Sequence, residues 1–113
     1  MKPKNIFLCD KIPEKNEGEL FESLCRDKSI NIERIISNGH KTSEGKWYNQ
    51  DHNEWVIILQ GKATLELENK EKINLSKGDY LLIPARLKHR VSYTSTNPVC
   101  IWLAVHFSNE PKN

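Results

Sequence analysis

From Trp47 to Phe107 the chain consists of short apolar segments that alternate with turn residues. Residues 63–68 show the pattern clearly, because Ala, Leu and Leu there alternate with Thr, Glu and Glu. Such alternation gives a strand with one buried and one wet face, since successive side chains point to opposite sides. Repeated at this spacing, it predicts an antiparallel sandwich or barrel rather than helices. We therefore expect an all-β domain.

Turn residues divide this region into six expected strands, and an earlier segment adds another. The six are Glu54 to Gln60, Ala63 to Glu68, Lys72 to Leu75, Tyr80 to Ile83, His89 to Thr94 and Val99 to Phe107. A total of about seven or eight short strands matches a small jelly roll.

Two segments precede these strands. Gly18 to Arg26 places its four apolar residues at helical spacing, which predicts one short helix. Asn31 to Ser37 alternates imperfectly, with Arg34 on one face and Glu33 and Ile35 on the other. We expect this second segment to be a strand.

Two blocks in the strand region have a fixed internal spacing. GKWYNQDHNEWVIILQG reads G-x8-E-x6-G, and GDYLLIPARLKH reads G-x5-P-x4-H. Their glycines suit tight strand connections, and their proline suits a strand end because it lacks a ladder donor. The residues that define the two blocks are Gly45, Glu54 and Gly61, then Gly78, Pro84 and His89.

The paired blocks resemble the signatures of the cupin superfamily, and the resemblance extends roughly from Ile32 to Phe107. It implies a small single-domain, RmlC-like cupin: a double-stranded β-helix, or jelly-roll barrel, with one short N-terminal helix. On this interpretation residues 1–31 are an N-terminal segment, residues 32–107 form the barrel, and residues 108–113 are a polar tail.

The family's first block usually carries H-x-H before the glutamate, and these two histidines, the glutamate and the later histidine bind a metal. In this chain Tyr48 and Gln50 stand at the H-x-H positions, whereas Glu54 and His89 are kept. Divalent transition metals favour imidazole nitrogen, so one His, one Glu, an amide and a phenol form a poor set. The resemblance therefore implies a divergent metal motif.

His106 could restore a metal shell, although it lies in a strand whose two faces are both apolar. If it points inward, Gln50, Glu54, His89 and His106 form a candidate site for Fe, Mn, Ni or Zn. Two other histidines are expected outside the site. His52 lies in a polar turn and is expected at the surface, and His40 lies in a polar loop and is expected to be solvated.

A metal-free reading uses some of the same residues. Glu54 can orient His89 as a base while Tyr48 donates a proton, which makes His89 and Tyr48 candidate catalytic residues. Three functions stay open: a metal-dependent oxygenase or isomerase, a metal-free epimerase or isomerase, and a non-catalytic domain that binds or senses a small molecule. The fold does not choose among them. The polar pair at positions 48 and 50 keeps the pocket hydrophilic, which favours the metal-dependent enzyme.

Composition limits the partners. The chain has 113 residues, enough for one compact domain, and its 17 basic and 15 acidic residues are spread along the sequence. We expect no nucleic-acid partner and no membrane partner, because there is neither a concentrated charge nor an apolar run of spanning length. Three separated cysteines indicate a reducing cytoplasm. The resemblance also implies a small-molecule ligand and a homodimer, with the strand from Ile30 to Ile36 available at the subunit boundary.

Overall fold

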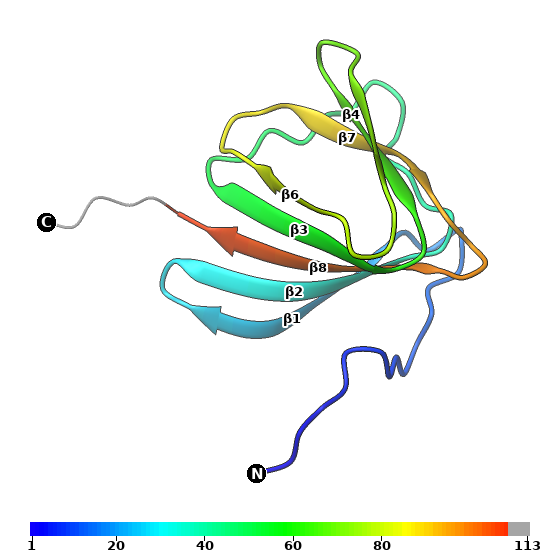
Figure 1. The fold of residues 1–113 in the computed structure, drawn as a ribbon, viewed down its shortest axis with the longest axis vertical. Coiled ribbons are helices and arrows are strands. Elements are labelled where there is room, and N and C mark those ends of the chain that lie inside the picture. Colours follow the sequence, from blue (N-terminus) through cyan, green and yellow to red (C-terminus); the bar gives the residue numbers. More distant parts are fainter. Residues whose placement is uncertain (109–113) are drawn as a thin grey trace, which may run out of the picture.

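The computed structural model describes residues 1–108, which form eight β-strands and no helix (Figure 1). The expected all-β fold is confirmed, and every expected strand is present with boundaries that differ by one residue at most. No helix in this part of the chain is long and apolar enough to cross a membrane. Most of the predicted polar tail, residues 109–113, lies outside the described residues. The strands are β1 (Leu20–Asp27), β2 (Ile30–Ser37), β3 (Asn53–Gln60), β4 (Ala63–Leu67), β5 (Lys72–Leu75), β6 (Tyr80–Ile83), β7 (His89–Thr94) and β8 (Cys100–Phe107).

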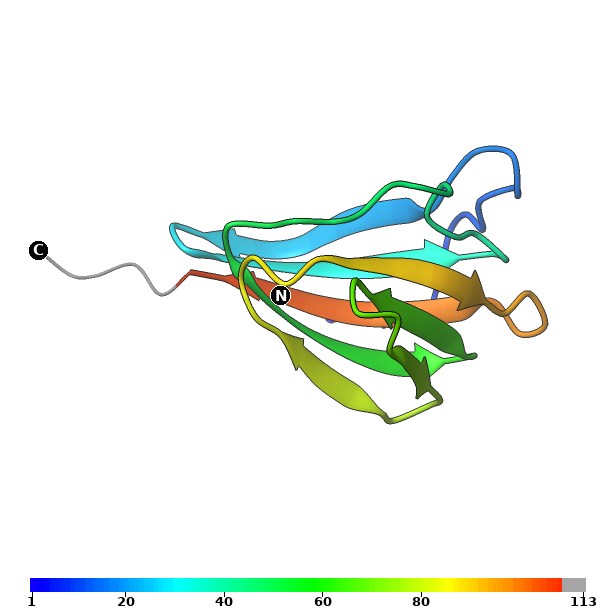
Figure 2. The same ribbon diagram turned by 90° about the horizontal axis from the view of Figure 1, so that it is seen from above.

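Two antiparallel sheets face each other and form the barrel (Figures 1 and 2). The larger sheet has the strand order β1-β2-β8-β3-β6, and the smaller has the order β5-β4-β7. Buried apolar side chains from both sheets pack together between them, which removes their surface from water and stabilises the fold. Ile35, Val56, Leu65, Val91 and Trp102 are among these core residues.

The short helix predicted over Gly18 to Arg26 is wrong, because these residues form most of β1. β1 pairs with β2 in antiparallel register, which places Glu22 opposite Arg34. The Glu22 carboxylate lies 2.6 Å from Arg34 Nη2, so pairing and charge both favour the extended backbone. A short apolar pattern does not separate helix from strand, and here the neighbouring strand decides.

β2 is an internal strand of the larger sheet, since β1 occupies one of its edges and β8 the other. The strand expected to lie at a subunit boundary therefore has no free edge within the chain. The edge strands of this sheet are β1 and β6.

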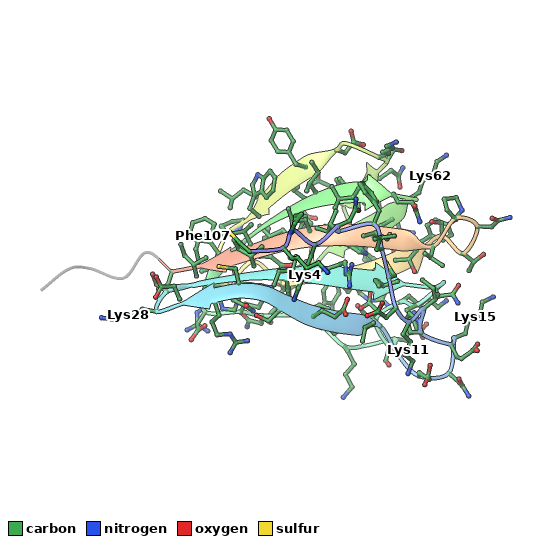
Figure 3. The ribbon with its side chains drawn as sticks, turned by 90° about the horizontal axis from the view of Figure 1, so that it is seen from below. Lys4, Lys11, Lys15, Lys28, Lys62 and Phe107 are labelled. Carbon is green, nitrogen blue, oxygen red and sulfur yellow. The ribbon has the colours of Figure 1, made fainter. Side chains whose placement is uncertain are left out.

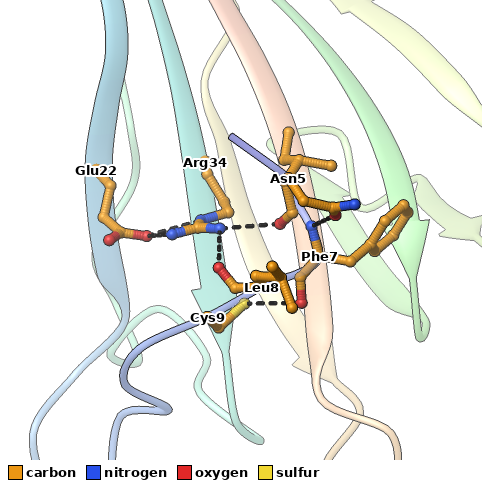
Figure 4. Close-up of polar contacts among 7 residues, drawn as sticks. Asn5, Phe7, Leu8, Cys9, Glu22 and Arg34 are labelled. Carbon is orange, nitrogen blue, oxygen red and sulfur yellow. Dashed lines mark hydrogen bonds and ion pairs between the residues drawn. The ribbon is translucent and has the colours of Figure 1, made fainter. Parts of the chain in front are cut away.

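The N-terminal segment is attached to the outer face of the larger sheet (Figures 3 and 4). Arg34 Nη1 donates hydrogen bonds to the carbonyl oxygens of Ile6 and Leu8 at 2.9 and 3.0 Å. Arg34 is only 8% exposed, and its bonds to carbonyls and to Glu22 offset the cost of burying its charge. Because side chains alternate along a strand, Glu33 and Ile35 face the barrel interior instead.

Candidate functional site

A pocket of about 90 Å³ lies inside the barrel between the two sheets. Its apolar wall includes Val56, Leu65, Ile83 and Trp102. The pocket shares some of its lining with a larger surface groove of about 510 Å³. The polar residues of the pocket are Glu19, Glu33, Tyr48, Gln50, Glu54, His89 and His106.

All five residues expected at the site line this one pocket: Tyr48, Gln50, Glu54, His89 and His106. Tyr48 reaches the pocket although residues 48–50 do not form a strand. Tyr48 forms an isolated β-bridge with His89, in which its N–H donates to the His89 carbonyl at 2.8 Å. The His89 N–H donates back to the Tyr48 carbonyl at 3.1 Å. This bridge holds Tyr48 against the first residue of β7.

His89 is 4% exposed, as the alternation along its strand predicts. Its Nδ1 lies 2.9 Å from the carbonyl oxygen of Leu87, and because a carbonyl only accepts, Nδ1 carries the hydrogen. In the neutral imidazole, Nε2 then holds a lone pair. Nε2 is 4.0 Å from Glu54 Oε1, which is beyond hydrogen-bond distance. The lone pair of His89 is therefore available to a ligand in the pocket.

Glu54 and Tyr48 complete the group around His89. Glu54 is 7% exposed, and the nitrogen of His89 that lies 4.0 Å from its carboxylate is too far away to donate a hydrogen bond to it. Burial, together with the negative charges of Glu19 and Glu54, raises the pKa of the Tyr48 phenol. The phenol therefore keeps its hydrogen and can donate a hydrogen bond to a ligand. The site combines a free base, a carboxylate and a hydroxyl donor.

Sequence reasoning missed two acidic residues of the pocket, Glu19 and Glu33. Glu19 accepts a short hydrogen bond from the Ser37 hydroxyl, which in turn accepts one from Trp102 Nε1 at 3.1 Å. Burial raises the pKa of Glu19, while the hydrogen bond from Ser37 opposes that change. A signal for Glu33 was present, because the alternation of β2 places it on the same face as Ile35. Glu19 lies at the start of the segment from Gly18 to Arg26, whose pattern was interpreted as helical.

His106 points toward the pocket, but both of its nitrogens have partners within the chain. Nε2 lies 2.7 Å from Glu33 Oε1, and Nδ1 lies 3.0 Å from His52 Nε2. The hydrogen bond to Glu33 raises the pKa of His106, and burial works against that rise. His52, which was expected at the surface, is partly exposed, and its ring packs against His106 with the centroids 5.0 Å apart.

These contacts decide how well the expected metal ligands fit a metal. Residues 1–108 contain no group of three or more His, Cys, Asp and Glu side chains that could hold a metal ion. The nitrogens of His106 contact Glu33 and His52 rather than the pair of Glu54 and His89, so inside the barrel only these two remain, with the amide of Gln50 as a weak addition. Catalytic zinc sites use about three protein ligands. The pocket therefore does not fit the four-ligand centre expected from Gln50, Glu54, His89 and His106.

His40 lies outside this pocket and is 8% exposed, so its expected solvation is wrong. Its Nδ1 accepts a hydrogen bond from the Asn38 N–H at 2.9 Å, and its Nε2 donates to the Glu14 carbonyl at 3.0 Å. The polar loop that carries His40 folds back against the N-terminal segment, and the ring supplies the hydrogen bonds between them. Its role is structural.

The acidic residues that line the pocket are not balanced by lysine or arginine in the described lining. These acidic residues are Glu19, Glu33 and Glu54. Arg34 and Arg90 instead form ion pairs with Glu22 and Glu66. The arrangement favours neutral or cationic ligands, because like charges repel strongly where water is excluded.

The chain is similar to known proteins in sequence and in structure. The family model described as "Cupin domain" matches residues 36–106. A crystal structure from Ralstonia eutropha JMP134, under the provisional name mannose-6-phosphate isomerase, superposes with a TM-score of 0.86. That protein is 37% identical, and the match covers 96% of this chain and 99% of the other.

Two further proteins are more distant. The uncharacterized protein YdbB of Bacillus subtilis (strain 168) is 36% identical over 62 residues, which are 53% of this chain and 55% of YdbB. The match thus spans about half the length of that relative. The crystal structure of a cupin superfamily protein from Desulfitobacterium hafniense DCB-2 has a TM-score of 0.71 at 18% identity, covering 90% and 84% of the two chains. This last likeness concerns the fold alone.

Proposed function

This chain belongs to the cupin domain family, and from that premise we propose that it is a metal-independent isomerase of small, uncharged hydroxy-carbonyl compounds. One observation carries the proposal. His89 presents an unpaired Nε2 lone pair to a buried pocket while the Tyr48 ring stacks on it, with the centroids 5.5 Å apart. A base and a hydroxyl donor beside one small pocket are what proton transfer next to a carbonyl requires.

The proposed reaction moves one proton between neighbouring carbons. His89 Nε2 removes the proton from the carbon beside the carbonyl, and the electron pair of that C–H bond forms a C=C bond. The carbonyl oxygen takes a hydrogen from the Tyr48 hydroxyl, which gives an enediol. His89 then returns its proton to the other carbon, and Tyr48 recovers its hydrogen from the second hydroxyl.

Glu54 supports this sequence through its charge. During transfer His89 becomes an imidazolium, and the Glu54 carboxylate lies 4.0 Å from the nitrogen that gains the proton. A negative charge at that distance attracts the positive charge that forms on the ring during the transfer. Glu54 thus lowers the cost of the intermediate without accepting the proton itself.

Size and charge limit the substrate. Sites for drug-sized ligands usually measure about 300–1000 Å³, whereas this pocket is about 90 Å³ and suits a molecule of a few carbon atoms. Its three carboxylates and its lack of lysine and arginine in the described lining oppose a phosphate group. The Ralstonia protein's name refers to a phosphorylated sugar. For this chain we propose the unphosphorylated class instead.

The test compares matched substrates that differ in charge. Glyceraldehyde and dihydroxyacetone are each incubated with the protein in D₂O beside their phosphate esters, and deuterium at carbon is followed by NMR against a protein-free blank. We expect incorporation above the blank for the neutral compounds and at least tenfold less for the esters. Faster turnover of the esters would overturn the assigned substrate class. A compound that raises the melting temperature but gains no deuterium would instead indicate a binding domain.

A further inference from the structure

Two imidazoles face each other at the mouth of the pocket. His52 Nε2 and His106 Nδ1 are 3.0 Å apart, and the rings are inclined at 69°. Both residues line the surface groove of about 510 Å³, and His106 lines the barrel pocket as well. The pair therefore lies between the groove and the pocket.

The outer nitrogen of each ring contacts a carboxylate. His52 Nδ1 lies 3.2 Å from Asp51 Oδ1, and His106 Nε2 lies 2.7 Å from Glu33 Oε1. An ionised carboxylate only accepts hydrogen bonds, so each outer nitrogen carries a hydrogen. In neutral imidazoles, both inner nitrogens then hold lone pairs. Two lone pairs at this separation need a cation between them, which can be a shared proton or a metal ion.

The surroundings match those of metal-binding histidines. Such histidines almost always donate their other ring N–H to a carboxylate, a carbonyl or water, which fixes the ring and raises its basicity. Here both rings have that support, from Asp51 and from Glu33. The Glu33 side chain is only 15% exposed, so its hydrogen bond with His106 is shielded from solvent.

The separation of the two nitrogens indicates the geometry. Two nitrogens bound to one metal at about 2.1 Å are about 3.0 Å apart at a right angle and about 3.4 Å apart at a tetrahedral angle. The observed 3.0 Å matches the right angle. Square-planar and tetragonal sites with nitrogen and oxygen ligands are characteristic of Cu(II) and Ni(II).

We propose that His52 Nε2 and His106 Nδ1 form a two-histidine site for Cu(II) or Ni(II) at the pocket mouth, with water in the remaining positions. This site differs from the four-ligand set expected inside the barrel, because it uses His52 and excludes Glu54 and His89. It has only two protein ligands, because residues 1–108 contain no group of three or more His, Cys, Asp and Glu side chains that could hold a metal ion. The site is independent of the isomerase proposal.

The experiment uses the full chain without a histidine tag, treated with a chelator that is then removed. Ni(II) and Cu(II) are titrated by calorimetry, and the Cu(II) complex is examined by electron paramagnetic resonance. We expect one equivalent of metal and hyperfine structure from two imidazole nitrogens. His52→Ala should weaken binding at least tenfold. Glu33→Gln keeps both histidine ligands but replaces the carboxylate that contacts His106 Nε2. This variant should also weaken metal binding about tenfold.

His89→Gln provides the contrast, and it should leave the metal affinity unchanged. The proposal is overturned if the protein binds neither metal, or if binding survives His52→Ala and is lost in His89→Gln. The second result would place the metal inside the barrel. Because His52 is partly exposed and lies outside the strands, His52→Ala should fold normally, and its circular dichroism spectrum and melting temperature verify this.

Discussion

Tyr48 and His89 are joined twice, by a pair of backbone hydrogen bonds and by stacked rings inclined at 24°. The two contacts have different consequences. The backbone bridge depends on no side chain, so it survives substitution at either position. The stacking places a phenol beside the imidazole that acts as the proposed base. The proton donor and the base are thus positioned by contacts between the same two residues.

Tyr48→Phe tests the donor. The phenylalanine ring keeps the stacking and the backbone bridge, so the melting temperature should change by no more than a degree or two. Loss of the hydroxyl should lower the rate of deuterium incorporation about 100-fold, within the range found for general acid catalysis. Tyr93→Phe is the matched control, since Tyr93 is 50% exposed and does not line the pocket. An unchanged rate in Tyr48→Phe would remove Tyr48 from the mechanism.

The His106 and Glu33 pair predicts a pH-dependent stability. The folded protein raises the pKa of His106 above its ordinary value of 6.5, chiefly through the hydrogen bond to Glu33. A raised histidine pKa means that the stabilisation is complete below pH 6.5 and is lost as the pH rises through the folded value. Glu33→Gln should therefore reduce the free energy of unfolding by about 1 kcal/mol at pH 5.5 and by clearly less at pH 9. Urea unfolding at the two pH values measures the difference, and equal losses would contradict this origin of the shift.

Gly61 and Gly78 form a matched pair for backbone strain. Both have positive φ, +82° and +89°, so alanine at either position should cost about 1–2 kcal/mol. A Cβ at Gly61 would also lie 2.6 Å from Ser95 Oγ and 2.8 Å from the Val99 carbonyl, whereas at Gly78 it would meet no atom within 4 Å. Gly61→Ala should thus destabilise the protein by about 1–3 kcal/mol more than Gly78→Ala. Similar unfolding free energies for the two variants would refute the steric argument.

The strands could be predicted because their signals are local. Residues such as Gly61 and Pro84 mark connections and strand ends, and alternation identifies the segments between them, so the boundaries agree to within one residue. The helix expected over Gly18 to Arg26 was wrong for the opposite reason. That segment is extended because it pairs with β2 and because Glu22 contacts Arg34. Neither interaction can be predicted from the sequence of the segment itself.

The site could be predicted in part. The paired blocks identified Tyr48, Gln50, Glu54 and His89, and all four line the pocket. Alternation also separated Glu33 from Arg34, but it could not say which face of β2 turns inward. That choice depends on the N-terminal segment, whose carbonyls cover Arg34. The contact of His52 with His106 joins residues 54 positions apart and has no signature in the sequence.

Metal-independent proton transfer by His89 is tested most directly by the rate of deuterium incorporation into glyceraldehyde. The rate is measured with chelator-treated protein and compared between the wild type and His89→Gln. The metal-depleted wild type should keep its full rate, because His89 and Tyr48 carry out the proton transfer without a metal. The His89→Gln variant, which retains a polar side chain of similar length, should lose at least 99% of that rate while remaining folded. A wild-type rate that vanishes on chelation and returns with added metal, or a His89→Gln variant of undiminished rate, would rule out metal-independent proton transfer by His89.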